Sequence, residues 1–130
     1  MADKKDRYKV PNGVKEEARQ GRDLRTMHGY GGGKVTKAVN YRLRVQKDVG
    51  YRTAVKIDTY YRRHEDVDPK GENFDNRKRP SKGYIMWKMM GGNSGHSWSK
   101  RLKRSLDVIQ KREKLNKINR TLEDIDGMVR

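Results

Sequence analysis

The most apolar stretch of the chain is Tyr84-Ile85-Met86-Trp87-Lys88-Met89-Met90, and Gly91-Gly92 follows it at once. A run this short has no usable periodicity, so it fits either a buried helix or a buried strand. We predict a short buried helix that the paired glycines end, with a strand as the alternative. Only 22 of the 130 residues are Leu, Ile, Val or Phe. The segment is therefore expected to supply much of a small core.

Apolar residues at helical spacing predict three helices on the N-terminal side of this stretch. They are expected over residues 13–28, 34–47 and 52–63. Asn12 is a candidate cap of the first helix, and Gly29 can end it in the left-handed conformation. The stripes predicted to face the core are Val35, Val39 and Leu43 in the second helix, and Ala54, Ile57, Tyr61 and His64 in the third.

On the C-terminal side the pattern is helical again from Ser97 onward, and it carries two apolar stripes. The first is formed by Leu102, Leu106 and Ile109, and the second, with heptad-like spacing, by Leu115, Ile118, Leu122 and Ile125. At about 100° per residue, the two stripes lie on nearly opposite sides of one helix. The sequence therefore predicts either a bend near residues 111–114 or a distal part that packs on another subunit. The second stripe is the candidate partner-binding set.

Together these elements predict a mainly α-helical protein, a small single-domain bundle of about four to five helices. Residues 1–12 form a basic N-terminal lead, residues 13–99 the helical core domain, and residues 100–130 an extended basic helical C-terminal arm. Within the core domain, residues 65–82 hold two prolines, Pro69 and Pro80, and many charges. They predict a long loop, and a loop of this length is usually functional or disordered.

The charge balance favours an anionic partner. Lys and Arg number 33 against 17 Asp and Glu, which gives a formal net charge of +16. Such an excess attracts polyanions, and the attraction weakens as salt is added. The candidate nucleic-acid-binding residues are Lys34, Arg77, Lys78, Arg79, Lys100, Arg101, Lys103, Arg104, Lys111 and Arg112. The alternative is that these groups form ordinary solvated faces.

Two motifs resemble ligand loops but depart from them. The glycines between Gly29 and Lys34 precede a helix, where backbone amides and a lysine can hold phosphate. However, Val35 stands where a Walker loop has Ser or Thr, so a plain helix connection is the alternative. The segment Asp66-Val67-Asp68-Pro69-Lys70-Gly71 resembles the opening of a calcium loop, but Arg77 takes the place of the bidentate Glu. A charged surface loop is the better interpretation.

The remaining polar and aromatic residues predict structural roles. The three histidines, His28, His64 and His96, have no metal-binding spacing. His64 shares a face with Ile57 and Tyr61, and we expect it to be hydrogen-bonded and partly buried. Tyr60, Tyr61, Tyr84 and Trp87 could stack on bases, but core positions are favoured because other large apolar residues are few.

Several classes of protein are excluded or disfavoured. The chain has no Cys, so disulfides and thiolate metal sites are impossible. No apolar run approaches the roughly 18 residues of a membrane span, and the N-terminus lacks the hydrophobic region of a signal peptide. We therefore expect a soluble intracellular protein without membrane contact. No metal-ligand or nucleophile constellation is present, so we expect no enzyme activity, no catalytic residue, no metal and no cofactor.

Three groups of residues carry a resemblance to a known family. They are Arg22-Asp23-Leu24-Arg25 with His28 through Gly33, Tyr60 through Glu65 with Asp68 through Gly71, and Ser81 through Trp87 with Gly91-Gly92, Gly95 and Trp98. This pattern resembles a small module of tailed-phage proteins, found alone or attached to XkdF-like head-maturation proteins, over about residues 18–99. The family usually has an arginine before its paired glycines, where this chain has Tyr30-Gly31. The resemblance implies a phage origin and a place in the host cytoplasm or the virion, and it transfers no catalytic residue.

Charge and resemblance together predict a phage-encoded protein that binds nucleic acid, chiefly double-stranded DNA, through phosphates and without base-specific readout. One alternative is a structural virion component, such as a capsid-associated or head-assembly protein. Another is a phage protein that binds and modulates a host factor. The C-terminal arm is the candidate contact for a second copy, another phage protein or a host protein.

Overall fold

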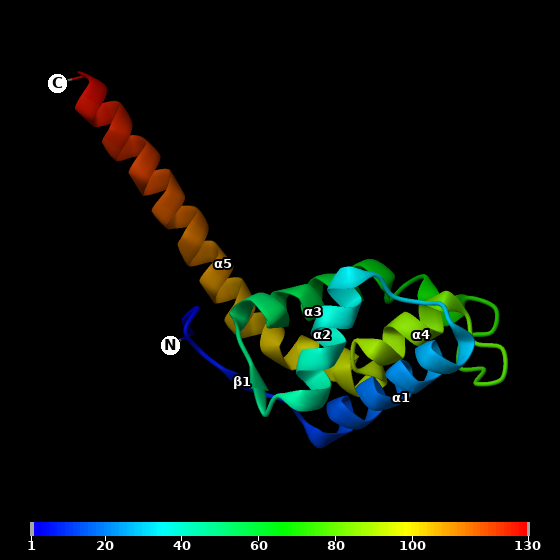
Figure 1. The fold of residues 1–130 in the computed structure, drawn as a ribbon. Coiled ribbons are helices and arrows are strands. Elements are labelled where there is room, and N and C mark those ends of the chain that lie inside the picture. Colours follow the sequence, from blue (N-terminus) through cyan, green and yellow to red (C-terminus); the bar gives the residue numbers. More distant parts are fainter. Residues whose placement is uncertain (1, 130) are drawn as a thin grey trace.

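The computed structural model describes residues 2–129, with side chains through residue 128, and it is mainly helical (Figure 1). The helices are α1 (Asn12–His28), α2 (Lys34–Val45), α3 (Tyr51–His64), the 3₁₀ turn η1 (Asp68–Lys70), α4 (Lys82–Met89) and α5 (Gly92–Val129). The prediction of a single-domain bundle of four to five helices with a long C-terminal helix is confirmed. None of the described helices is both long and apolar enough to cross a membrane.

The stretch from Tyr84 to Met90 forms α4 and the turn after it, as predicted, so the strand alternative is wrong. The Ser81 hydroxyl caps α4 by accepting a hydrogen bond from the Tyr84 amide at 3.0 Å. Trp87 is 2% exposed and lies against the rings of Tyr61 and His96. The Tyr61 hydroxyl donates to the carbonyls of Trp87 and Gly92. Trp87 and Tyr61 therefore tie α3, α4 and the start of α5 into one core.

The contact of α1 with α4 depends on Gly21. A β-carbon placed on Gly21 would lie 2.3 Å from the Met89 nitrogen, far inside van der Waals distance. The absence of a side chain thus lets the two helix backbones approach closely. Gly29 ends α1 as predicted, in the left-handed conformation with a φ of 76°, and its amide donates to the Arg25 carbonyl at 2.8 Å.

The expectation that Asn12 caps α1 is wrong. Asn12 is the first residue of the helix, and Pro11 occupies the capping position without a side-chain hydrogen bond. The helix begins one residue earlier than predicted because the Lys15 amide bonds to the Pro11 carbonyl at 3.1 Å.

The stripe predicted for α2 is partly wrong. Val35 is 58% exposed, whereas Asn40 is buried beside Val39 and Leu43. Asn40 can be buried because its side-chain amide donates to the carbonyls of Ala18 and Met89, both at 2.9 Å. A buried polar group with satisfied hydrogen bonds loses little relative to water. Hydrogen bonding to α1 and α4 therefore sets the rotation of α2.

The N-terminal lead joins the bundle through a short strand pair. β1 (Tyr8–Lys9) pairs antiparallel with β2 (Asp48–Val49), and Tyr8 faces Val49. Tyr8 and Val10 are buried, so this part of the lead belongs to the core. Two residues per strand are too few for the alternating pattern by which strands are recognised in a sequence.

The long loop between α3 and α4 packs against the bundle. η1 lies within it, and Asp68 accepts from His64 Nδ1 at 3.0 Å. Phe74 places its ring against Tyr84 and Trp87. His64 also stacks on the Tyr60 ring at 4.5 Å, which confirms the prediction of a hydrogen-bonded, partly buried histidine.

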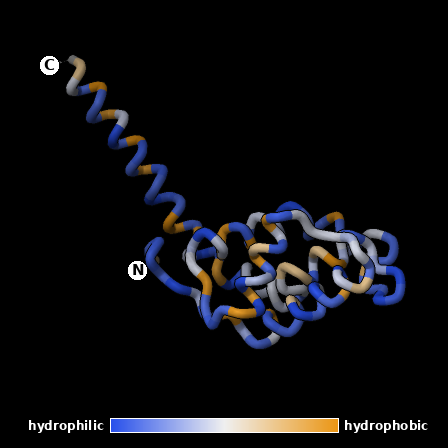
Figure 2. Tube along the Cα trace, viewed as in Figure 1, coloured by the Kyte–Doolittle hydropathy of each residue, from blue (hydrophilic) through white to orange (hydrophobic). Residues whose placement is uncertain are grey.

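The last helix passes unbroken from the bundle into a projecting arm (Figure 1). Of the two alternatives, the bend near residues 111–114 is wrong, because α5 is one helix through both stripes. Leu106 and Ile109 are buried in the bundle. Figure 2 shows the arm as a mostly hydrophilic rod with regularly spaced hydrophobic positions. These include the second stripe, whose residues Leu115, Ile118, Leu122 and Ile125 are 51–59% exposed.

The start of α5 is held by a carboxylate from another helix. Glu17 of α1 accepts hydrogen bonds from the Asn93 and Ser94 amides and from the Lys88 ammonium, at 2.8–3.2 Å. Burial alone would raise the pKa of Glu17, but the bonds from Ser94 and Lys88 outweigh it and leave the pKa below its usual value. The ionised carboxylate complements the positive end of the helix dipole and anchors the base of the arm.

Candidate nucleic-acid interface

The basic residues in the middle of α5 are mostly exposed and outnumber the acids among them. Nine Lys or Arg residues lie between residues 100 and 120, against Asp107 and Glu113. Within the described part of the chain, none of the nine forms an ion pair, while Glu113 pairs with Lys4 of the lead. The candidates Lys100, Arg101, Lys103, Arg104 and Lys111 are exposed, and Arg112 is partly buried. The nine therefore form a row of cations along α5, spread over more than one side of the helix, without an ion-pair partner among the described residues.

The part of this row nearest the bundle runs beside the C-terminal end of α3. Glu65 bonds to His96 at 2.6 Å, and this bond lowers the Glu65 pKa most. The charges of Lys100 and Lys103 lower that pKa further, by smaller amounts. Asp58, about two helical turns earlier on α3, pairs with Arg62 at 2.8 Å. Both of these acids are thus already engaged.

The other predicted basic cluster lies elsewhere. Arg77, Lys78 and Arg79 are exposed, and the Asn76 side chain accepts the amides of Lys78 and Arg79 at 3.0 Å. The Arg77 carbonyl contacts His28 at the end of α1. Figure 1 places this loop and the projecting arm at opposite ends of the bundle. The structure therefore does not gather all predicted cations into one patch.

The glycine segment before α2 packs as a connection. The Gly31 carbonyl accepts from Arg25 Nε at 2.8 Å, and the Tyr30 hydroxyl bonds to the Pro80 carbonyl. Lys34 is exposed at the start of α2. The segment contacts α1 and the long loop, and its Tyr30 packs against the cluster that contains Ile85 and Met89 of α4. A phosphate contact of Lys34 stays a prediction.

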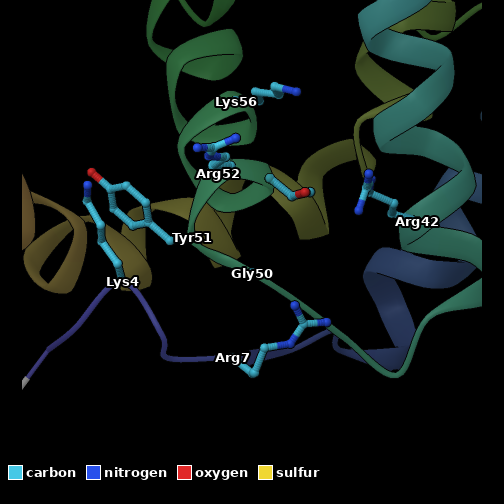
Figure 3. A pocket seen from close by; sticks show the side chains of 8 residues that line it. Lys4, Arg7, Arg42, Gly50, Tyr51, Arg52 and Lys56 are labelled. Carbon is cyan, nitrogen blue, oxygen red and sulfur yellow. The ribbon is translucent and has the colours of Figure 1, made fainter.

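A second basic site, which the sequence pattern did not reveal, lies where the lead, α2 and α3 meet. It is a pocket of about 480 Å³ at the N-terminal end of α3 (Figure 3). Figure 3 shows Arg52 and Lys56 on α3, Arg42 on α2 across from them, and Arg7 on the lead below. The lining residues are Lys4, Arg7, Arg42, Gly50, Tyr51, Arg52, Thr53 and Lys56.

This pocket is formed by residues far apart in the sequence. The lead is placed there by the β1–β2 pair, in which Lys9 faces Asp48. Arg7 then bonds Asp48 through Nε and Nη2, both at 2.8 Å. The only sequence signal is the spacing of Arg52 and Lys56, which lie four residues apart and so share one side of a helix. That signal alone does not distinguish the site from a solvated face.

The structure also locates the aromatic and metal-ligand candidates. Tyr60, Tyr61, Tyr84 and Trp87 are all at most 8% exposed, which favours their core interpretation over base stacking. Burial raises the pKa of the Tyr60 and Tyr61 hydroxyls, so both stay neutral. Among the described residues, no three His, Asp or Glu side chains gather in a way that could hold a metal ion. The calcium-like segment instead contains η1, where Asp68 binds His64.

No protein-family model matches the chain, and comparisons with curated proteins and with solved structures find no match.

Proposed function

We propose that the protein binds nucleic acid, chiefly double-stranded DNA, through its phosphates and without base-specific readout. The observation that carries the proposal is the row of nine cations on α5, none of which forms an ion pair with a described residue. Unpaired cations on a surface are available to replace the counterions that surround a duplex. The resemblance to the tailed-phage module would place that duplex in an infected cell or a virion.

Phosphate binding without base readout fits the side chains present. The four aromatic residues predicted as candidates for base stacking, Tyr60, Tyr61, Tyr84 and Trp87, are in the core at 8% exposure or less. The exposed residues of α5 between 100 and 120 are dominated by Lys and Arg. Phosphate contacts position a protein on a duplex but carry no sequence information. Affinity is therefore expected to depend strongly on salt and weakly on sequence.

Neutralising the start of the row is the direct test. Changing Lys100, Arg101, Lys103 and Arg104 to Gln should weaken binding to duplexes of unrelated sequence alike. The slope of log affinity against log salt should become shallower by up to about 0.9 for each phosphate that the variant no longer neutralises. Fluorescence anisotropy with labelled duplexes at several salt concentrations measures both quantities.

The matched control removes four charges elsewhere on the surface, with Lys9, Lys37, Lys47 and Lys82 changed to Gln. Lys9 and Lys37 are exposed, and Lys47 and Lys82 lie at the ends of surface connections. If both variants bind more weakly by the same factor, net charge alone explains binding and α5 is not the interface. If the α5 variant binds with unchanged affinity and slope, the proposal that this row binds DNA is wrong.

We also propose that the distal half of α5 pairs with another protein chain, with a second copy as the first partner to test. The observation in its favour is that Leu115, Ile118, Leu122 and Ile125 are 51–59% exposed on a helix that projects from the bundle. Their spacing of three, four and three residues is that of a coiled-coil seam. Such an interface would suit a structural virion component or a protein that binds a host factor.

Truncation after Gln110 is expected to remove an oligomer without unfolding the bundle. The deleted side chains are mostly exposed, and removal of the exposed Lys4–Glu113 pair should cost at most about 1 kcal/mol. Light scattering should report a smaller mass, while the thermal melting temperature should change by only a few degrees. A full-length chain that is monomeric at all concentrations tested would remove the second copy as the partner. A large fall in stability would instead show that the arm folds back on the bundle.

A further inference from the structure

The pocket at the start of α3 is more than a cluster of like charges, because backbone donors face the same place. Gly50 caps α3 without a side chain, and no acidic residue lies in the first turn. The first amide that bonds back is that of Ala54, which donates to the Gly50 carbonyl at 3.1 Å. The amides of Tyr51, Arg52 and Thr53 thus have no partner within the helix, and they lie at the positive end of its dipole.

The cations around these amides differ in whether they are already paired. Lys4 and Arg7 are engaged with Glu113 and Asp48. Within the described part of the chain, Arg42, Arg52 and Lys56 form no ion pair. The positive charges of these three side chains therefore repel one another. An anion bound in the pocket would offset that repulsion.

Arg7 is held so that one of its nitrogens remains available. The Asp48 carboxylate accepts hydrogen bonds from Nε and Nη2, and the Asp48 backbone carbonyl accepts a further bond from Nη2 at 3.1 Å. The remaining nitrogen, Nη1, lies next to Gly50, where a β-carbon on that residue would be only 3.0 Å away. A guanidinium fixed in this way donates at lower entropic cost than a freely moving arginine.

A mostly buried threonine with an unpartnered hydroxyl supplies an independent sign of a ligand. Thr53 lines the pocket and is only 7% exposed. Its hydroxyl makes no hydrogen bond to any described residue. Thr53 Oγ1 is not among the fully buried unpaired atoms, so this hydroxyl is open to the pocket, where a ligand could bond to it.

From these donors we infer that the pocket is a binding site for one phosphate group. A tetrahedral phosphate presents several oxygens to donors that approach from different sides, as the amides of α3, Arg7, Arg42, Arg52 and the Thr53 hydroxyl do. The phosphate can belong to a nucleic-acid backbone or be free in solution. In the first case the inference rests on the proposed function and adds a fixed contact to the diffuse one made by α5.

Titration calorimetry with inorganic phosphate, in a buffer of constant ionic strength, tests the site. The variant Arg52→Gln/Lys56→Gln should bind phosphate at least about tenfold more weakly than the parent, since each charged hydrogen bond contributes on the order of 1.5–3 kcal/mol. The variant Thr53→Val keeps shape and net charge, so weakening there reports the hydroxyl itself. The control Lys37→Gln/Lys82→Gln removes the same charge from exposed positions outside both the pocket and the α5 row, and it should bind like the parent.

The side chains of Arg52 and Lys56 are exposed, so the double variant is expected to fold, and circular dichroism verifies this. The inference is overturned if the parent binds no phosphate, or if the pocket variants bind it as the parent does. Binding of duplex DNA by the same variants distinguishes a nucleic-acid phosphate from a free phosphate. Weaker binding of both phosphate and duplex by the pocket variants supports a backbone phosphate, whereas weaker binding of phosphate alone supports a site for free phosphate. If the parent binds phosphate but no duplex, the pocket stands and the proposed function fails.

Discussion

Replacing Trp87 with alanine is expected to lower the free energy of unfolding by about 3–5 kcal/mol, the range found when a buried large aromatic side chain is removed. Trp87 is 2% exposed, and the rings of Tyr61, His96 and Phe74 surround it with centroids 4.7–5.8 Å away. Small domains have total stabilities of only about 5–15 kcal/mol. The substitution therefore removes a large fraction of the stability of the domain.

Two further variants make this result interpretable. Trp87→Phe keeps an aromatic ring but removes the hydrogen bond from Nε1 to Asn93 at 2.9 Å, so its stability should fall between those of the parent and the alanine variant. Tyr41→Ala removes an aromatic ring that is 56% exposed and should cost little. Urea denaturation followed by far-ultraviolet circular dichroism measures all three. A Trp87→Ala protein with the same free energy of unfolding as the parent would contradict the position of Trp87 in the core.

The helices were predictable because the core depends on apolar residues repeated at helical spacing. Val39 and Leu43 in α2, and Ala54 and Ile57 in α3, are buried as their spacing predicts. The rotation of α2 was not predictable, because the buried Asn40 depends on carbonyls of two other helices. The unbroken course of α5 was also not predictable from the sequence. Opposed stripes predict a bend only if both must be buried, and here the second is exposed.

The two candidate sites also differ in whether they could be predicted from the sequence. The row on α5 could be predicted because its cations are close together in the sequence and lie on one continuous helix. The phosphate pocket could not, since Arg7, Arg42 and Arg52 come from the lead, α2 and α3. Their approach depends on the β1–β2 pair, which involves only two residues per strand. A site that is assembled by tertiary contacts leaves no local pattern.

The second large effect is expected at Gly21, where adding a single methyl group should lower the free energy of unfolding by about 2–3 kcal/mol. In a solvent-exposed helix, Gly→Ala stabilises by roughly 1 kcal/mol, because alanine restricts the unfolded chain and favours the helix. At Gly21 the added carbon would lie 2.3 Å from the Met89 nitrogen and 2.5 Å from the Lys88 carbonyl carbon. These are backbone atoms, so the collision cannot be relieved by a side-chain rotation. α1 and α4 must separate, and overpacking of a well-packed core typically costs about 1–3 kcal/mol, occasionally more.

The control is Gly127→Ala, at a helical position of α5 where a β-carbon would meet nothing within 4 Å. It should leave stability unchanged or slightly higher, because only helix propensity acts there. Urea denaturation of both variants measures the difference. Because α4 carries Trp87, a separation of α1 from α4 should also change near-ultraviolet circular dichroism in the Gly21→Ala protein before it unfolds. If Gly21→Ala is as stable as Gly127→Ala, the two helices do not approach each other as closely as described, and the packing of α1 on α4 is wrong.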